Sequence, residues 1–367
     1  MSTTVSLGLQ RRERLAQALR DGGYDVLIAY GNAWQGDYLR YATDFGLLEG
    51  HGLALVACDG EVVLFLESAV DAERAHIEAA GIEVRWAPDA PDAVLAELRR
   101  RGDPLLAGAP YKLLPRKLLR AGAKIADATA LVDRLLMHKL PAELDAIREA
   151  ARLADDAYRV FIHAASEGTP QYGVVAEVEA FLRAHGSADN FMLIGSGGPD
   201  VRGMTPPSDR RLARGDMVTT ELTPELGGYY AQICRTLVVG KASDVQKRAF
   251  AVYHEALEAG LAAVRPGARA SDVARAENDV FRKYDLGVYT TNEYTRVRGH
   301  GVGVFPDAKP HILEDVDDEL APGMALVVHP NTYHPDAGYI VLGDSVIVTE
   351  NGAEVLARTP RDLFEAG

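Results

Sequence analysis

The first third of the chain changes repeatedly between two spacings of its apolar residues. Residues 9–22 carry them three and four positions apart and end at a pair of glycines, which predicts a helix. The apolar run 53–66 is divided by an Asp-Gly pair, which predicts a hairpin. Further short strands are expected at 25–30, 82–86, 105–108 and 123–127. Strands that alternate with helices indicate a small α/β domain.

The remainder of the chain contains several helical patterns. Pro141 predicts the start of a long helix, and a second helix is expected over 172–185. Farther on, Ser243 and the Gln three residues later form a capping box that opens a helix, and Ser271 is expected to open another. Two domains are therefore expected, 1–136 and 137–367.

Between these helices lies a stretch with strand character, 215–236. Residues 217–222 are rich in β-formers, Pro224 and a pair of glycines interrupt the pattern, and strand character resumes at Tyr229. This order predicts a β-hairpin.

Polar residues are spaced two apart on both predicted strands. Because side chains alternate between the two faces of a strand, Glu221 shares a face with Thr219. On the second strand, Gln232 shares a face with Tyr230 and Cys234. Polar groups on a buried face need hydrogen-bond partners, so we take this hairpin as the centre of the candidate site.

The composition is that of an ordinary globular protein, with 47% hydrophobic and 25% charged residues. The formal net charge of −14 disfavours a nucleic-acid partner, because phosphate binding needs clustered Lys and Arg. No basic segment followed by an apolar run stands at the beginning, and no apolar stretch approaches the roughly 20 residues that span a bilayer. We expect a cytoplasmic protein without membrane contact, in which Cys58 and Cys234 form no disulfide.

Four segments in a fixed order resemble the signature segments of one enzyme family. They are GDMV…GGYY…RT within 215–236, RGHGVG at 298–303, LAPGMALVVHPNTY at 320–333 and GDSVIVTENGAEVL at 343–356. This order is similar to that of the creatinase, aminopeptidase P, prolidase and methionine aminopeptidase family. The resemblance implies an α/β plus α+β fold, in which a creatinase-type N-terminal α/β domain precedes a pita-bread catalytic domain.

The metallopeptidases of that family hold two metal ions with two Asp, one His and two Glu. Carried over residue by residue, these positions fall on Glu221, Gln232, His300, His329 and Gly343. Only His300 is kept. Bridging carboxylates hold two cations about 3.5–4 Å apart, and the two bridging positions here are an amide and a glycine. The resemblance therefore implies a member without the dinuclear metal centre.

Two interpretations of these altered positions stay open. In one, Glu221, His300 and His329 hold a single divalent metal, since two His and one carboxylate form mononuclear iron and zinc sites. In the other, the residues form a metal-free polar cluster in which His300 is the general acid or base. His329 then shares the proton transfer or polarises the carbon, and Glu221 and Gln232 orient substrate or water. The cofactor is left open.

Cys234 is a further candidate, because creatinase, a metal-independent member, carries a Glu at the matching position of its hairpin. A thiolate nucleophile needs a nearby base or positive charge to lower its pKa, which His300 or His329 would supply. The alternative is a buried, inert cysteine.

Residues that flank the family's site are candidates for binding a small-molecule substrate. Met204 stands where the family's peptidases carry a His that helps to bind the substrate carbonyl, and Asp307 stands at another His position of the family. The full set is Met204, Tyr230, Arg298, Asp307, His311 and His334. For each, a solvated loop position is the alternative.

These departures favour a non-peptidase enzyme that acts on a C–N bond of a small amino-acid-like or amidine-like substrate, as creatinase does. A mononuclear metalloenzyme and a pseudo-enzyme used as a binding module are the alternatives. Creatinase-like relatives are commonly homodimers, so the resemblance also implies a homodimer in which Trp34 reaches the partner's site.

Overall fold

The computed structural model describes residues 6–102, 105–120 and 124–367 of the chain. The chain divides into two compact units, Met1–Leu136 and Met137–Gly367. Within the described ranges, no helix is both long and apolar enough to cross a bilayer.

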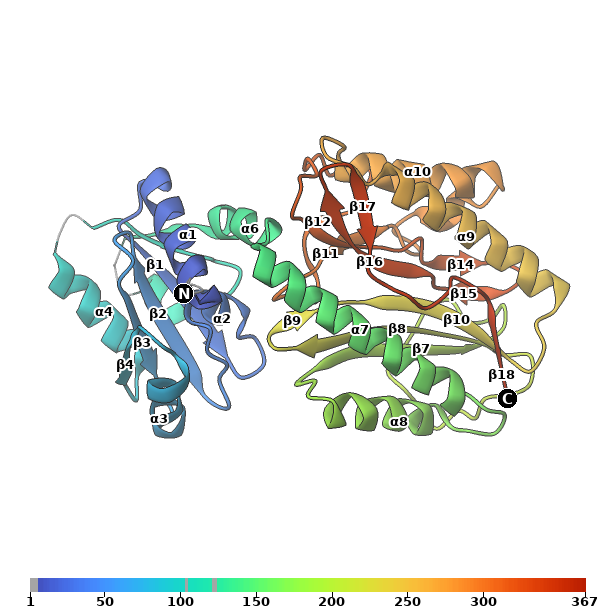
Figure 1. Ribbon diagram of the computed structural model, residues 1–367, viewed down its shortest axis with the longest axis horizontal. Coiled ribbons are helices and arrows are strands. Elements are labelled where there is room, and N and C mark those ends of the chain that lie inside the picture. The colour runs from blue at the N-terminus through green and yellow to red at the C-terminus, as the bar shows by residue number, and fades with distance from the viewer. Residues whose placement is uncertain (1–5, 103–104, 121–123) are drawn as a thin grey trace, which may run out of the picture. The chain divides into compact units, whose positions relative to one another are not determined.

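The first unit is built on a six-stranded mixed sheet in the order β4-β3-β2-β1-β5-β6 (Figure 1). Its strands are β1 (Val26–Asn32), β2 (His51–Ala57), β3 (Val62–Leu66), β4 (Glu83–Trp86), β5 (Ala107–Ala109) and β6 (Ile125–Asp127). Its helices are α1 (Leu7–Gly22), α2 (Asp37–Thr43), α3 (Ala69–Glu78), α4 (Ala90–Arg101), α5 (Arg116–Arg120) and α6 (Thr129–Met137), which ends at the boundary. Apolar residues of β1, β2, β3 and α4 form one core, which confirms the expected α/β domain.

The second unit contains a ten-stranded, largely antiparallel sheet with the central order β12-β11-β13-β16-β10-β8-β7. Its strands are β7 (Asn190–Gly197), β8 (Met217–Leu226), β9 (Tyr229–Tyr230), β10 (Ile233–Val239), β11 (Gly299–Gly301), β12 (Ala308–His311), β13 (Ala325–Val328), β16 (Gly343–Thr349), β17 (Gly352–Val355) and β18 (Phe364–Ala366). A separate ribbon is formed by β14 (Thr332–His334) and β15 (Gly338–Ile340).

Two pairs of helices pack on this sheet (Figure 1). Helices α7 (Pro141–Ala164) and α8 (Gln171–Ala184) share a core with β7, β8 and β10. Helices α9 (Asp244–Ala263) and α10 (Ala270–Lys283) share a second core with β13 and β16, and the short 3-10 helix η1 (Gly287–Thr290) follows α10. The repeated pairing of helices with one half of a sheet is the expected pita-bread arrangement.

The central hairpin forms, but its interruption is not where the sequence predicts it. Strand β8 runs through Pro224, whose Cα is paired with that of Asn190 on β7. The break lies in the second strand, at residues 231–232, between β9 and β10. Because the neighbouring strand is interrupted opposite Pro224, the missing N–H of the proline costs little there. The turn itself uses Gly227 and Gly228, both with positive φ, as a two-residue hairpin loop prefers.

Of the two helix starts predicted at serines, the one at Ser243 is confirmed and the one at Ser271 is wrong. Ser243 caps α9, with its side chain accepting from the backbone N of Gln246 and the Gln246 side chain accepting in return. Helix α10 begins one residue before Ser271, because the Asp272 side chain caps the backbone N of Arg269 at 2.9 Å.

Candidate active site

The hairpin brings Glu221 and Cys234 directly opposite each other on β8 and β10, and directly opposed residues share one face of a sheet. On β8, Val218 and Leu222 point to the other face and pack in the core beneath α7 and α8. The alternation predicted from the sequence therefore holds, and it directs the polar side chains away from the helices.

Glu221 is held by an amide that the sequence does not single out. The Nδ2 of Asn331 donates to the Glu221 carboxyl at 2.7 Å. Asn331 is itself fixed, because its Oδ1 accepts from the backbone N of Leu342 at 2.9 Å. Burial raises the pKa of Glu221 to about 7, against the lowering effect of the Asn331 hydrogen bond, and the Asp307 carboxylate raises it further. Glu221 as a whole residue is half-buried.

His300 and His329 lie side by side, with their ring centroids 5.4 Å apart. The position of His300 depends on its glycines: a Cβ at Gly299 would lie 2.1 Å from the Val327 carbonyl oxygen, and one at Gly301 would lie 2.1 Å from that of Lys309. The Nδ1 of His300 lies 3.0 Å from the Gly301 carbonyl, which can only accept, so the Nε2 carries the lone pair.

Both histidines are neutral near pH 7. Burial lowers the pKa of His300, and burial together with the neighbouring His300 and Arg298 lowers the pKa of His329 to about 3. The Nδ1 of His329 is buried and has no hydrogen-bond partner among the described residues. An unpartnered buried nitrogen of this kind is costly and rare, so it needs an explanation.

Gln232 and Cys234 complete the cluster. The Gln232 backbone N donates to the Ser345 hydroxyl at 2.8 Å, and its Nε2 donates to the Cys234 sulfur at 3.2 Å. Cys234 is fully buried. Burial, and secondarily the Glu221 carboxylate, raise the pKa of its thiol well above the ordinary value. These surroundings favour the neutral thiol and oppose the activation that a thiolate nucleophile requires.

Tyrosines form an apolar wall beside the cluster. Tyr333 on β14 is paired with Tyr339 on β15, and both pack with Cys234. Burial and the Glu221 carboxylate raise the pKa of Tyr339 to about 12, and its hydroxyl lies 3.0 Å from that of Thr295. Sequence reasoning missed Asn331, which lies within the signature segment 320–333, and Tyr339, which follows it.

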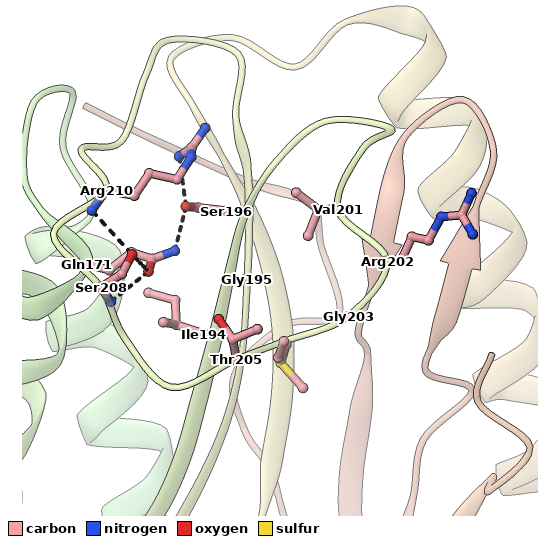
Figure 2. A pocket seen from close by; sticks show the side chains of 11 residues that line it. Gln171, Ile194, Gly195, Ser196, Val201, Arg202, Gly203, Thr205, Ser208 and Arg210 are labelled. Atoms are coloured by element: carbon pink, nitrogen blue, oxygen red, sulfur yellow. Dashed lines mark hydrogen bonds between the residues drawn. The ribbon is translucent and has the colours of Figure 1, made fainter. Parts of the chain in front are cut away.

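Met204 joins this cluster to a neighbouring cavity. It packs against the group that contains Cys234, Tyr333 and Tyr339. It also lines a cavity of about 340 Å³, whose other wall is a hydrogen-bonded set of polar side chains (Figure 2). That set consists of Gln171, Ser196, Ser208 and Arg210.

The other flanking residues fall into two groups. Asp307 lies near the cluster, because its charge acts on the pKa of Glu221 and of both histidines, and it accepts from His311 at 2.9 Å. Tyr230 is turned away, since its hydroxyl donates to Asp189 at 2.9 Å.

Arg298 is a neighbour of His329, whose backbone N donates to the Arg298 carbonyl at 3.0 Å, whereas His334 lies at another cavity. Arg298 is buried over the Phe281 ring, and it donates to the backbone carbonyls of Thr295 and Asn331. His334 lines a different cavity, of about 960 Å³, beside the beginning of α9.

The residues present do not fit a dinuclear metal centre. In the described part of the chain, no three His, Cys, Asp or Glu side chains form a group that could hold a metal ion. The set of Glu221, His300 and His329 is therefore not arranged as a mononuclear site either. At Gly343, an added Cβ would lie 2.5 Å from the Cβ of His329, so a bridging carboxylate cannot enter at this position without displacing the histidine.

Comparisons with known proteins agree with this fold. The chain matches the model of metallopeptidase family M24 over residues 145–350, more than half of its length. An Xaa-Pro dipeptidase of Pyrococcus furiosus is 29% identical over 236 residues, which cover 64% of this chain and 67% of that protein. A probable dipeptidase of Mycobacterium tuberculosis is 30% identical over 239 residues, which cover 65% of this chain and 63% of that protein.

A solved structure extends the likeness to both units. The Xaa-Pro dipeptidase from Bacillus anthracis has a TM-score of 0.85 and 25% identity, and the match covers 98% of this chain and 99% of that chain. These relatives are peptidases, which corrects the expectation of a non-peptidase, creatinase-like enzyme. The chain belongs to metallopeptidase family M24, as a member that lacks the ligand set of the dinuclear metal centre.

Proposed function

We propose that the protein hydrolyses the amide C–N bond of a short peptide, with Glu221 as the group that carries the proton. The observation that supports this most directly is a half-buried glutamate whose carboxyl pKa is raised to about 7 and which Asn331 holds in place. A general base works best when its pKa lies near the operating pH. The dipeptidase names of the relatives support the peptide class of substrate.

Glu221 acts twice in this mechanism. Its carboxylate takes a proton from a water molecule as the water oxygen attacks the carbonyl carbon of the amide. The resulting carboxylic acid then gives that proton to the nitrogen as the C–N bond breaks, and the products are a free amine and a carboxylic acid. The neutral His300 accepts a hydrogen bond at Nε2 and orients the attacking water.

The negative charge that develops on the carbonyl oxygen needs hydrogen-bond donors. The Thr295 hydroxyl is within reach of the Tyr339 oxygen. When Thr295 donates to Tyr339, the phenol O–H is left to donate to the substrate. The high pKa of Tyr339 keeps that proton on the phenol.

The test is an assay of dipeptide hydrolysis, with Xaa-Pro dipeptides in the panel, using wild type and the Glu221→Gln variant. Glutamine keeps the oxygen that faces Asn331 but cannot accept the water proton. We expect kcat to fall by about 100-fold or more, the lower end of the usual contribution of a general base.

The matched control is Glu177→Gln, the same change on the exposed face of α8. It should retain wild-type kcat. Equal activity of Glu221→Gln and wild type would remove Glu221 from the mechanism, and no hydrolysis of any peptide by the wild type would overturn the proposed function.

The proposal includes the homodimer. Its support on this chain is Trp34, a large apolar side chain that is 88% exposed in the first unit. Light scattering coupled to size-exclusion chromatography should report twice the chain mass, and a monomer at assay concentration would refute this part.

A further inference from the structure

Most basic side chains around the polar cluster already have a partner. Arg210 pairs with Asp216, Arg296 with Asp315 and His311 with Asp307, and Arg298 is buried against backbone carbonyls. Arg202 is different, because it is exposed and forms no ion pair or hydrogen bond with the described residues. Its guanidinium carbon lies 5.7 Å from the centre of the Tyr333 ring.

The place of Arg202 connects it to the reactive groups. Tyr333 is paired with Tyr339, and the Glu221 carboxylate acts on the pKa of Tyr339. Tyr333 and Tyr339 also pack with Cys234, which is paired with Glu221 across β8 and β10. Figure 2 shows the Arg202 side chain pointing away from the polar set of Gln171, Ser196 and Arg210 on the opposite wall of the cavity.

We propose that Arg202 binds the free C-terminal carboxylate of the peptide substrate. This inference rests on the proposed hydrolysis of a short peptide and names its recognised end. A guanidinium presents paired N–H donors that match a carboxylate, and stacking on an aromatic ring fixes its plane while its edge stays available. The contact with the Tyr333 ring thus restricts the position of the Arg202 guanidinium.

The overall charge of the protein strengthens this argument. A dipeptide such as alanyl-proline is a zwitterion without net charge, but in a protein of formal net charge −14 its carboxylate end meets mostly like charges. A substrate with a free carboxylate therefore needs a local cation that no protein carboxylate has neutralised. Of the basic groups compared above, Arg202 is the one in that state.

The test is the binding of alanyl-proline and of alanyl-proline amide, measured by titration calorimetry in the Glu221→Gln background, so that turnover does not interfere. The two ligands differ only in the charge of the C-terminus. We expect the acid to bind about 10- to 100-fold more tightly than the amide, the usual effect of a hydrogen-bonded charge pair. Adding Arg202→Met should abolish this difference, whereas Arg202→Lys should keep part of it.

The control is Arg214→Met, which removes another exposed arginine of the same unit, whose ion pair with Glu167 is long at 3.6 Å. It should keep the full preference for the acid. Thermal unfolding of both variants checks that each remains folded. Equal binding of acid and amide, an unchanged preference in Arg202→Met, or no binding of the acid at millimolar concentration would overturn the role of Arg202.

The outcome is separable from that of the proposed function. Suppose that the acid binds more tightly than the amide, that Arg202→Met abolishes this preference, and that no peptide is hydrolysed. This result would keep the carboxylate site and refute the proposed hydrolase. Hydrolysis of peptide acids and amides with equal kcat/KM would keep the hydrolase and refute the carboxylate site.

Discussion

The ion-pair network around Arg235 and the polar cluster around Glu221 use neighbouring positions of the same strands, but they differ in how completely their polar groups are bonded. Arg235 follows Cys234 and is fully buried, and it donates to Asp344 at 2.7 Å and to the carbonyls of Gly343 and Pro360. Asp344 also accepts from Arg361 at 2.6 Å.

The cluster one position away is bonded far less completely. His329 Nδ1 and the Thr219 hydroxyl are buried without a partner among the described residues. Glu221 keeps a pKa near neutrality in the same cluster. A fully bonded network stabilises the fold, whereas buried polar groups without partners reduce stability.

The largest expected effect on stability comes from breaking the network. Replacing Arg235 with Met leaves the Asp344 carboxylate buried with only Arg361 for a charge partner. Removing one partner of a buried pair costs about 3–5 kcal/mol. Urea unfolding should show this loss in the free energy of unfolding, with Arg214→Met as the unaffected control. A loss no greater than that of the control would mean that the network does not secure the fold.

Removing the Glu221 charge from the cluster should increase the free energy of unfolding at high pH, opposite to the effect of Arg235→Met. The pKa of Glu221 rises on folding from an ordinary 4.5 to about 7. Its contribution to stability is thus fully present below pH 4.5 and is lost as the pH rises through 7, where a partly buried charge must form. Glu221→Gln should therefore become more stable than wild type at pH 8, by about 2–3 kcal/mol relative to the difference at pH 4.

Denaturant midpoints measured at both pH values test this, and Glu177→Gln provides the baseline. A Glu221→Gln stability difference that does not change with pH would show that the carboxyl titrates normally.

A smaller effect is expected at Asn331. Its hydrogen bond lowers the pKa of Glu221. Asn331→Ala should therefore shift the rise of kcat/KM with pH toward higher pH, while the rate at the high-pH plateau changes less. A uniform loss of rate at every pH, without a shift, would mean that Asn331 supports the structure only.

The smallest effect on activity is expected at Cys234. Its buried thiol is neutral, so Cys234→Ala should keep a kcat close to that of the wild type. A nucleophile would lose on the order of a thousandfold or more. Initial-rate assays decide between these outcomes, and a loss of that size would restore Cys234 as the attacking group.

Local patterns predicted much of the fold. The Ser243 capping box and the start of α7 at Pro141 are set by residues a few positions apart, so the sequence alone locates them. The predicted start of α10 at Ser271 was wrong because Arg269 and Asp272 form the cap of that helix. The strand break predicted at Pro224 was wrong, because the cost of its missing N–H depends on whether the neighbouring strand needs that hydrogen bond.

The site was predictable only in part. The resemblance located Glu221, His300 and His329, but the bond from Asn331 to Glu221 joins positions 110 residues apart. The pairing of Tyr333 with Tyr339 places a phenol beside Glu221 only after the β14–β15 ribbon has folded onto the sheet. The packing that raises the pKa of Glu221 also comes from several distant segments. Such effects cannot be read from spacing along the chain.

The most direct test of the account is the pH dependence of kcat/KM for dipeptide hydrolysis, measured after dialysis against a chelator. With Glu221 as the general base, kcat/KM of the wild type should rise with pH to a plateau, through one ionisation near pH 7, and Glu221→Gln should lack that ionisation. Hydrolysis that disappears with the chelator and returns with added divalent metal, or an ionisation that persists in Glu221→Gln, would contradict the account.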